Sequence, residues 1–326
     1  MQNGCGRREK RFPGRRSLQW TELTADGTCT EQVRQTDAKA RVLDRYGIMQ
    51  WTGPLNGTSL RLETAEVPMY AFESRVRYSE IGADGKLTPE KLIDYFQDCS
   101  TFQSEENGAG ISCLQKKNLA WIIVYWRVEI LRMPGLGEEI RIGTLPYEMK
   151  GGVGLRNFLM ETTCGERLAT ANSVWTLIDT GTFRPVRIPA EILKAYPLEE
   201  RLDMQYDSRK IRIPKEPGTV MPQMTVKEYH LDTNRHVNNG QYVRLAAGVL
   251  PTDMTPETLR IEYRRQAVLG DVITPVVYDL TQESGNGPQE HSGEQKCRKA
   301  CISLNADDGQ PYAVLEVLYR IPHAKE

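Results

Sequence analysis

The sequence has few histidines, a net charge close to zero and no long apolar segment. Only four of its 326 residues are histidine, and none lies at a spacing typical of a zinc site. No apolar run reaches the roughly 20 residues that a membrane-spanning helix needs. The formal net charge of −1 argues against nucleic-acid binding, which depends on neutralising many phosphates. We therefore expect no metal or other cofactor, no nucleic-acid partner and no stable membrane insertion.

Cysteine is also scarce, and its pattern excludes a disulfide scaffold. The seven cysteines are odd in number and scattered, and no two of them form a Cys-x-x-Cys pair. We interpret them as reduced thiols and predict a cytoplasmic protein. The remaining composition, 39% hydrophobic and 26% charged, is typical of a soluble globular protein. The length indicates about two domains.

Residues 1–66 differ from the rest of the chain. They begin with a run of arginines and a lysine and then continue without sustained periodicity. A targeting peptide is Arg-rich and poor in acids, but Glu9 interrupts the run and further acidic residues soon follow. We favour a disordered N-terminal extension; a natural start at Met69 is a further possibility.

The segment 69–180 reads as one antiparallel α+β unit. Residues 70–82 alternate like a strand, Asp84-Gly85 predicts a turn, and Thr88 with Pro89 predicts the start of a helix over 88–105. Four strands are predicted to follow, over 119–132, 138–147, 153–163 and 166–179. One helix followed by several strands is the order expected of an antiparallel sheet wrapped around a helix.

The segment 222–322 repeats part of this pattern after a proline-rich crossing over 181–221, in which we expect one short helix at 189–195. Residues 223–231 predict a strand and 239–249 a helix, while the polar stretch 281–296 predicts a solvated loop. The short stretches that lead into the two helices align without gaps, which indicates a tandem duplication, although chance can also produce one short match. The aligned pairs are Ile81 with Leu231, Asp84 with Asn234, Lys86 with His236, and Thr88 with Asn238.

The run Leu231–Tyr242 (LDTNRHVNNGQY) concentrates polar side chains where the second helix begins. If the run is extended, Asp232, Asn234 and His236 point to one side of it. Asn238 or Asn239 can then cap the helix, whose N-terminus offers positive potential to a developing oxyanion. The competing interpretation is a capping turn in which these side chains bind their own backbone. For Asn234 with His236 we favour a functional role.

This run resembles the catalytic segment of hotdog-fold thioesterases, and it is most similar to the acyl-acyl-carrier-protein thioesterases. Four further pieces carry the likeness, which covers most of 69–320: Trp121–Arg132 (WIIVYWRVEILR), Gly154–Phe158 (GLRNF), Arg184–Pro189 (RPVRIP) and Ile261–Arg265 (IEYRR). The resemblance implies an α+β fold of two tandem hotdog domains, each an antiparallel sheet wrapped around a central helix. It also implies hydrolysis of acyl-acyl-carrier protein in fatty acid biosynthesis, releasing free fatty acid.

Thioester hydrolysis needs a base for water and a site for the oxyanion, because the thiolate leaves easily. His236 can act as the base, Asn234 can hold the oxyanion or the water, and Asp232 can orient either of them. We further predict that Trp121, Trp126 and Phe96 bind the acyl chain, although core packing explains such aromatics equally well. The family resemblance places the acyl pocket in the N-terminal half.

The expected partner is an acyl carrier protein with a phosphopantetheine-linked acyl chain. Because such carriers are acidic, we expect a basic docking surface, although an ordinary solvated surface explains any single residue as well. The chain itself is expected to be a monomer or a homodimer. The docking candidates are Arg132, Lys150, Arg156, Arg184 and Arg187.

The sequence departs from the family at Gln266 and Ala267. Better-known members have a carboxylate at the position of Gln266, and plant members have a cysteine at that of Ala267. Gln266 can hold a water but cannot take its proton, and Glu262 lies about 13 Å away along a strand. Either His236 or Asp232 then transfers the proton alone, or the enzyme is slow. A non-catalytic acyl-binding module, an acyl-coenzyme A thioesterase and a hotdog dehydratase are the alternatives.

Overall fold

The computed structural model describes residues 41–43, 48–50, 69–281 and 296–321. The chain divides into two compact units, residues 1–67 and 68–326. In the first unit, β1 (Arg41–Leu43) pairs antiparallel with β2 (Ile48–Gln50). The rest of the predicted extension 1–66, and nearly all of the predicted loop 281–296, lie outside the described residues. No helix in the described part of the second unit or the first is long and apolar enough to cross a membrane.

The N-terminal half of the second unit contains one long helix and five strands. Its elements are β3 (Tyr70–Arg75), the 3-10 helix η1 (Tyr78–Glu80), α1 (Pro89–Glu106), α2 (Ile111–Gln115), β4 (Leu119–Ile130), β5 (Glu139–Lys150), β6 (Val153–Thr162) and β7 (Arg167–Asp179). Helix α1 begins where Thr88-Pro89 predicts it. The Thr88 hydroxyl, however, donates to the Glu80 carbonyl and does not cap the helix.

The C-terminal half repeats this order with shorter elements. After α3 (Ala190–Leu193) in the crossing segment come β8 (Thr219–Val220), β9 (Met224–Thr225), the 3-10 helix η2 (Glu228–His230), α4 (Asn239–Ala247), β10 (Thr255–Tyr263), β11 (Val272–Asp279), β12 (Lys296–Asn305) and β13 (Pro311–Ile321).

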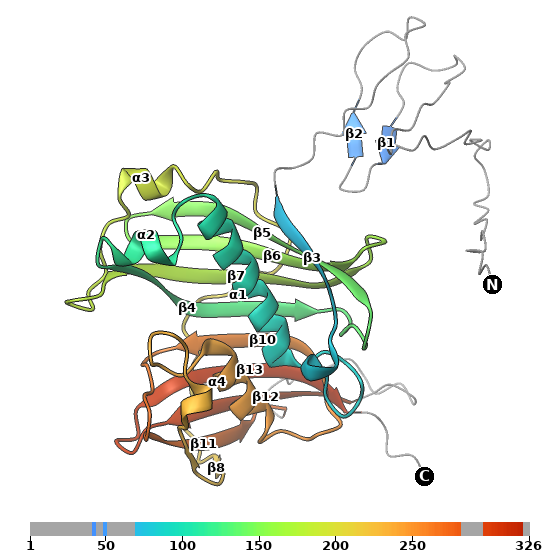
Figure 1. The fold of residues 1–326 in the computed structure, drawn as a ribbon. Helices are drawn as coiled ribbons and strands as arrows, with labels where there is room; N and C mark the ends of the chain where they lie inside the picture. The colour runs from blue at the N-terminus through green and yellow to red at the C-terminus, as the bar shows by residue number, and fades with distance from the viewer. Residues whose placement is uncertain (1–40, 44–47, 51–68, 282–295, 322–326) are drawn as a thin grey trace, which may run out of the picture. The chain divides into compact units, whose positions relative to one another are not determined.

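One antiparallel sheet runs through both halves. Its strand order in the described residues is β3-β5-β6-β7-β4-β10-β13-β12-β11-β8, with β9 beside β11. The halves meet where β4 pairs with β10, for example Trp126 with Ile261. Helices α1 and α4 lie on the same side of this sheet, one over each half (Figure 1). The predicted α+β class with two tandem hotdog halves is therefore confirmed.

Two predicted strands are shorter than their alternating patterns suggest. Residues 70–82 form β3 only as far as Arg75, and residues 223–231 form only β9; a 3-10 turn follows each. In the first half, the Glu80 carboxylate is the reason. It is buried, and it accepts hydrogen bonds from the Tyr95 hydroxyl at 2.7 Å and the Arg77 N–H at 2.8 Å. These bonds turn the chain back toward α1, which alternation alone cannot predict.

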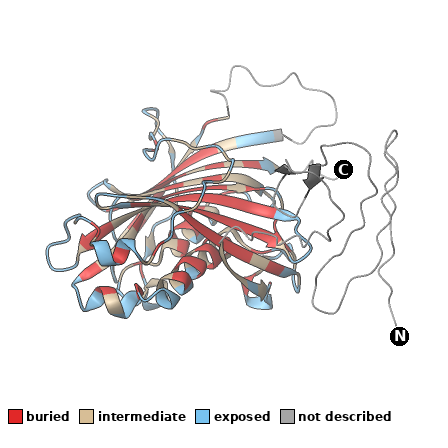
Figure 2. Cartoon of the chain, turned by 90° about the horizontal axis from the view of Figure 1, so that it is seen from above, coloured by how far each residue is buried: buried red, intermediate tan, exposed pale blue. Residues whose placement is uncertain are grey.

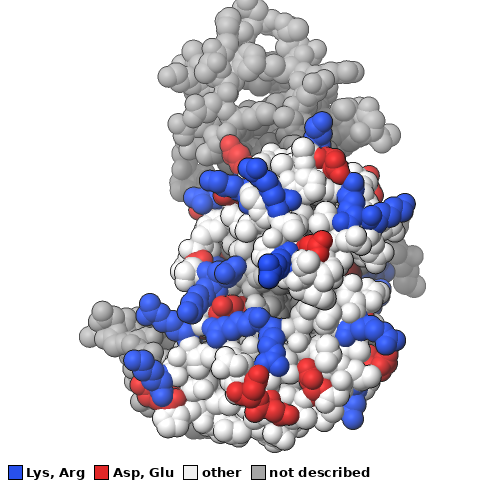
Figure 3. All heavy atoms as spheres, turned by 90° about the vertical axis from the view of Figure 1, so that its left-hand side faces the viewer, with Lys and Arg blue, Asp and Glu red and all other residues white. Residues whose placement is uncertain are grey.

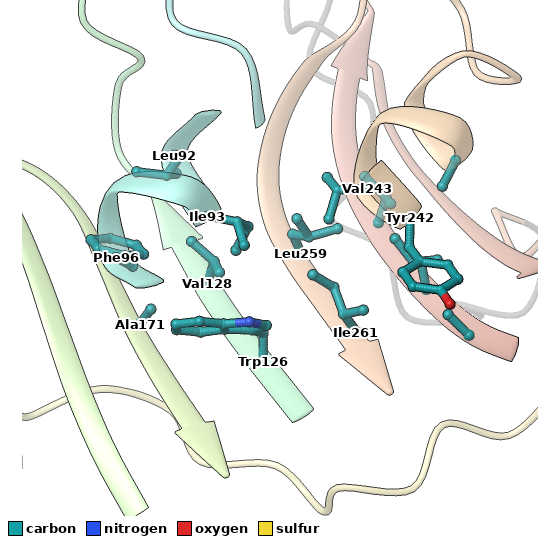
Figure 4. Close-up of a cluster of buried hydrophobic side chains, with 14 of the residues drawn as sticks. Leu92, Ile93, Phe96, Trp126, Val128, Ala171, Tyr242, Val243, Leu259 and Ile261 are labelled. Atoms are coloured by element: carbon teal, nitrogen blue, oxygen red, sulfur yellow. The ribbon is translucent and has the colours of Figure 1, made fainter. Parts of the chain in front are cut away.

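The core lies between the helices and the sheet. Leu92, Ile93 and Phe96 form the buried stripe of α1, and each contributes roughly 1.5–3 kcal/mol by leaving water. The face of the sheet under the helices is buried along most of its length (Figure 2). Side chains from β4 and β10, including Val128 and Leu259, join the two helices in one cluster (Figure 4). The two halves therefore share one main core cluster, and two smaller clusters lie apart from it.

Candidate active site

The polar run 231–238 is a tight turn, so the extended conformation considered from the sequence is wrong. The Asp232 N–H donates to the His236 carbonyl at 2.8 Å, and Leu231 forms a bridge with Val237. Arg235 has a φ of 62°, a left-handed conformation that few non-glycine residues adopt. The turn, rather than strand alternation, brings the polar side chains together.

Asp232 holds this turn in shape. Its Oδ1 accepts hydrogen bonds from the backbone N–H of Asn234 at 2.8 Å and from that of His236 at 3.3 Å. An aspartate that binds the backbone two residues on is an Asx turn. Asp232 therefore fixes the backbone under both Asn234 and His236, which is the capping interpretation for this residue. Its own side chain also lines the adjoining cavity.

Asn238 caps helix α4, as the sequence predicts for 238 or 239. Its Oδ1 accepts from the Gly240 N–H at 2.8 Å. Asn239 instead reaches across to the other half, where its Nδ2 donates to Gln97 Oε1 of α1 at 2.9 Å. The Asn239 carbonyl accepts from the Tyr263 hydroxyl at 3.1 Å. The start of α4 is thus anchored to α1 and to β10.

The turn borders a cavity of about 500 Å³ that both halves build. Asp232, Asn234, His236 and Gln266 all line it. Asn234 and Gln266 are exposed and His236 is half-buried, so these three lie toward the open side. The remaining wall comes from both halves. The N-terminal half contributes α1, α2 and β4 to β7, the crossing segment contributes Tyr196, and the C-terminal half contributes Tyr242 of α4 and residues 263–265 at the end of β10. Polar groups suited to acyl chemistry therefore meet the mouth of a pocket.

The backbone of His236 is fixed, whereas no hydrogen bond holds Nδ1 of its ring among the described residues. Its N–H is held by Asp232, and its backbone forms a bridge with Val268 beyond the end of β10. Its ring Nδ1 is buried without a hydrogen-bond partner among the described residues. Nδ1 is thus shielded, and Nε2 is the ring nitrogen left to interact with a molecule in the cavity.

Gln266 and Glu262 lie in different surroundings as well as four residues apart in the chain. Gln266 lines the cavity, whereas the Glu262 carboxylate accepts from the Ile211 N–H at 2.9 Å and from Arg264 at 2.8 Å. Glu262 is absent from the cavity wall, so it does not replace the missing family carboxylate. In the described residues the one acidic side chain in that wall is Asp232.

The three predicted acyl-binding aromatics do not share one location. Trp121 lines the cavity beside a β-bulge between Ile123 and Tyr125. Phe96 and Trp126 are fully buried, and their rings stack at 6.1 Å without forming part of the wall. For these two, core packing is the role that the structure shows. Periodicity cannot distinguish a core aromatic from one that faces an empty space.

One of the five docking candidates is wrong. Arg156 is only 4% exposed and lines the cavity, so it cannot meet a partner protein at the surface. Arg132 is engaged by Glu138 and Glu166 at 2.7 Å each. Lys150, Arg184 and Arg187 are exposed. A basic residue in a strand faces solvent or the core according to tertiary packing alone.

Helix α1 presents a polar wall to the cavity that the sequence-based predictions do not include. Gln97, Ser100, Thr101 and Ser104 all line it, at the helical spacing i, i+3, i+4 and i+7. The signal is present in the sequence as a second stripe beside the apolar one. An apolar stripe is the usual guide to how a helix faces a sheet, so this pattern gives the polar stripe no role.

Comparisons with known proteins agree with this architecture. The family model described as the acyl-ACP thioesterase N-terminal domain matches residues 69–196, and that of the acyl-ACP thioesterase C-terminal domain matches residues 215–319. The chain belongs to the acyl-ACP thioesterase family. The two matches coincide with the two halves of the sheet, each with its own helix.

The sequence identity to individual relatives is low. A palmitoyl-acyl carrier protein thioesterase from Gossypium hirsutum is 28% identical over 268 residues, which cover 77% of this chain and 63% of the relative. An acyl-[acyl-carrier-protein] hydrolase from Cuphea viscosissima is 26% identical over 234 residues, covering 66% of this chain and 56% of the relative. The chain thus matches little more than half the length of these chloroplastic proteins.

A solved structure shares the fold. The 12:0-ACP thioesterase from Umbellularia californica superposes with a TM-score of 0.64 at 19% identity, covering 77% of this chain and 94% of that one. At this level of identity the likeness concerns the fold alone.

Proposed function

We propose that this protein hydrolyses the thioester of acyl-acyl-carrier protein and releases free fatty acid. The observation that carries the proposal is the cavity on which Asn234, His236 and Gln266 converge, with most of the rest of its wall supplied by the N-terminal half. Family membership supports the same reaction. The acyl chain enters the cavity, and its carbonyl lies beside the turn 231–238.

In this mechanism, water adds to the thioester carbonyl carbon, the C–S bond breaks, and the products are a carboxylic acid and a thiol. His236 takes the proton of the attacking water through Nε2 and returns it to the departing sulfur. The Asn234 amide donates a hydrogen bond to the carbonyl oxygen as that oxygen becomes negative, with help from the positive end of α4. Gln266 orients the water.

Asp232 has an indirect role in this proposal. Its carboxylate already binds the two backbone N–H groups of the turn, so it positions Asn234 and His236 by fixing the chain beneath them. This role agrees with the sequence expectation that Asp232 orients the reacting groups. In a catalytic triad the acid binds the imidazole ring itself. Here the Asp232 carboxylate binds the backbone N–H of His236 instead.

The partner is an acyl carrier protein, and its acidic surface meets basic residues near the cavity. Arg264 and Arg265 line the cavity wall and are exposed, and Arg235 is exposed in the turn itself. Lysine and arginine side chains are spread over the face that Figure 3 turns to the viewer. Complementary charge of this kind speeds the encounter of two proteins more than it strengthens their binding.

A cytoplasmic location stays a prediction from the cysteine pattern.

The test is a product assay with defined acyl-carrier-protein and acyl-coenzyme A substrates of matched chain length, followed by mass spectrometry. We expect free fatty acid, formed faster from the carrier protein. Faster release from acyl-coenzyme A would contradict the assignment of the partner. Tight binding of acyl-carrier protein without turnover would identify a non-catalytic acyl-binding module, the alternative that Gln266 in place of a carboxylate favours.

A further inference from the structure

The cavity contains a buried arginine that the proposed reaction does not use. Arg156 extends from β6 toward α1, where its Nη1 donates to Gln103 Oε1 at 2.8 Å and to Thr144 Oγ1 at 3.3 Å. The guanidinium carbon lies 5.3 Å from the centre of the Tyr196 ring. All three partners are neutral, and the described residues provide no ion pair to Arg156 within 4 Å.

The charge of Arg156 is only weakly compensated by its surroundings. Burial lowers the pKa of Arg156 to about 10, the opposite of what a close ion pair does. The acid that acts on it is Glu199, whose two carboxylate oxygens are buried without a hydrogen-bond partner. Burial raises the pKa of Glu199 to about 7, so this carboxylate is only partly ionised at neutral pH. The site can therefore take up a further hydrogen-bond acceptor or negative charge.

The walls of the cavity differ in polarity. Trp121, Ile123 and Trp175 belong to an apolar wall on the sheet, whereas α1 contributes its stripe of amide and hydroxyl groups. The Ser100 hydroxyl donates to the Gln97 carbonyl at 2.8 Å, which leaves its oxygen able to accept. The Ser104 hydroxyl donates to the Ser100 carbonyl at 2.7 Å and already accepts from the Tyr196 hydroxyl at 2.9 Å. A plain hydrocarbon chain offers no hydrogen bond to Ser100 or to Arg156 in addition to those they already make, and placing polar groups against hydrocarbon instead of water is costly.

We propose that the preferred acyl group carries an oxygen substituent on its distal part, a hydroxyl, keto or carboxylate oxygen that accepts a hydrogen bond from Arg156. This inference rests on the proposed function, because it places the acyl chain in the cavity. In the order β6-β7-β4-β10, β6 lies three strand spacings from the strand that leads to Gln266. That separation is about 14 Å, so the recognised oxygen is remote from the thioester.

The experiment compares acyl-carrier-protein substrates in pairs of equal carbon number, with and without a distal hydroxyl, keto or carboxylate group. For the wild type we expect kcat/KM to favour an oxygenated member by about 10-fold or more, the range for hydrogen bonds to charged groups. Arg156→Met should abolish this preference by raising KM for the oxygenated member, and Arg156→Lys should keep part of it. The three kinds of oxygen distinguish a neutral acceptor from an anion.

Met149→Leu is the matched control, because Met149 lines the same cavity with an apolar side chain. It should change both members of each pair equally. A wild type that hydrolyses the plain chain as well as or better than every oxygenated one overturns the inference. If Arg156→Met then accepts longer plain chains, Arg156 is a stop that limits chain length. Should that variant fail to fold, the wild-type comparison decides alone.

Binding of non-hydrolysable thioether analogues on phosphopantetheine, measured by calorimetry, separates this inference from the proposed function. Preferential binding of the oxygenated analogue without hydrolysis of any thioester keeps the inference and removes the proposed function. Hydrolysis with no preference for the oxygenated chain keeps the proposed function and removes the inference. Failure of both analogues to bind overturns the inference, because the cavity then does not take an acyl chain.

Discussion

The turn before α1 and the turn before α4 have the same backbone and different side chains. In both, a 3-10 helix leads to a bridge across the turn, Ile81 with Leu87 in one half and Leu231 with Val237 in the other. The residue at the tip is left-handed in each, Gly85 with φ 76° and Arg235 with φ 62°. The same turn, with a bridge across it and a left-handed residue at its tip, therefore occurs in both halves.

The strands that face these turns also correspond. The Leu87 N–H donates to the Pro134 carbonyl, and the Val237 N–H donates to the Ala267 carbonyl, both at 2.9 Å. On this correspondence the position of Gln266 is occupied by Met133 in the N-terminal half, which is buried. Asn234, His236 and Gln266 of the C-terminal half thus correspond in position to Asp84, Lys86 and Met133 of the N-terminal half.

Only the second turn meets a large cavity. Asn234, His236 and Gln266 line it, while their three counterparts do not. Helices α1 and α2 and strands β4 to β7 of the N-terminal half build most of the wall that lies beside the C-terminal turn. The same turn therefore occurs in both halves, and its second copy lies at the cavity.

The largest expected difference concerns the imidazole. His236→Ala should lower kcat by about 10²-fold or more, because it removes the base, whereas Lys86→Ala at the matching position should leave kcat unchanged. Steady-state hydrolysis of acyl-carrier protein measures both. Wild-type rates in the His236 variant would remove this residue from the mechanism, and equal losses in both would show that the turns matter only for folding.

The second comparison concerns the amide. Asn234→Ala should lower kcat by about 10²-fold with little change in KM, since its hydrogen bond strengthens as the oxyanion forms. Asp84→Ala is the matched change in the first turn, where the Asp84 carboxylate accepts from the Lys86 N–H at 3.1 Å. It should affect only stability. A loss expressed in KM for the Asn234 variant would point instead to substrate binding.

The third comparison concerns the tips of the turns. Gly85→Ala should lower the free energy of unfolding by about 1 kcal/mol, because the left-handed region is unfavourable for a residue with a Cβ. A Cβ at Gly85 has no neighbour within 4 Å, so steric crowding adds nothing. Arg235→Gly should have a smaller effect in the opposite direction. Urea unfolding measures both; a neutral Gly85 variant would show that the first turn relaxes.

The smallest effect is expected at the departure from the family. Gln266→Glu should retain or raise activity, because it restores a carboxylate that can both hold water and accept its proton. Gln266→Met, which copies residue 133, is the control and should reduce activity several-fold. Initial rates at saturating substrate compare the two. Complete loss in the glutamate variant would mean that the amide itself takes part.

Local sequence patterns predicted many of the helices, strands and turns. The Thr88-Pro89 start of α1, the strand runs after it and the alignment of Lys86 with His236 follow from short-range rules on caps, alternation and turns. Those rules failed where a distant residue intervenes. Glu80 ends the first strand because Tyr95 and Arg77 bind its carboxylate, and neither partner is visible to a pattern of alternation.

The sequence alone determined which residue types are available and how each half is ordered: one usable histidine, one asparagine beside it, and two copies of a strand-turn-helix unit. The tertiary structure decided which of them share a space. It placed Arg156 inside the cavity rather than on the surface, and Trp126 in the core rather than in the wall. The physical reason is that a cavity arises from the packing of whole elements from both halves, and local periodicity carries no information about the space between them.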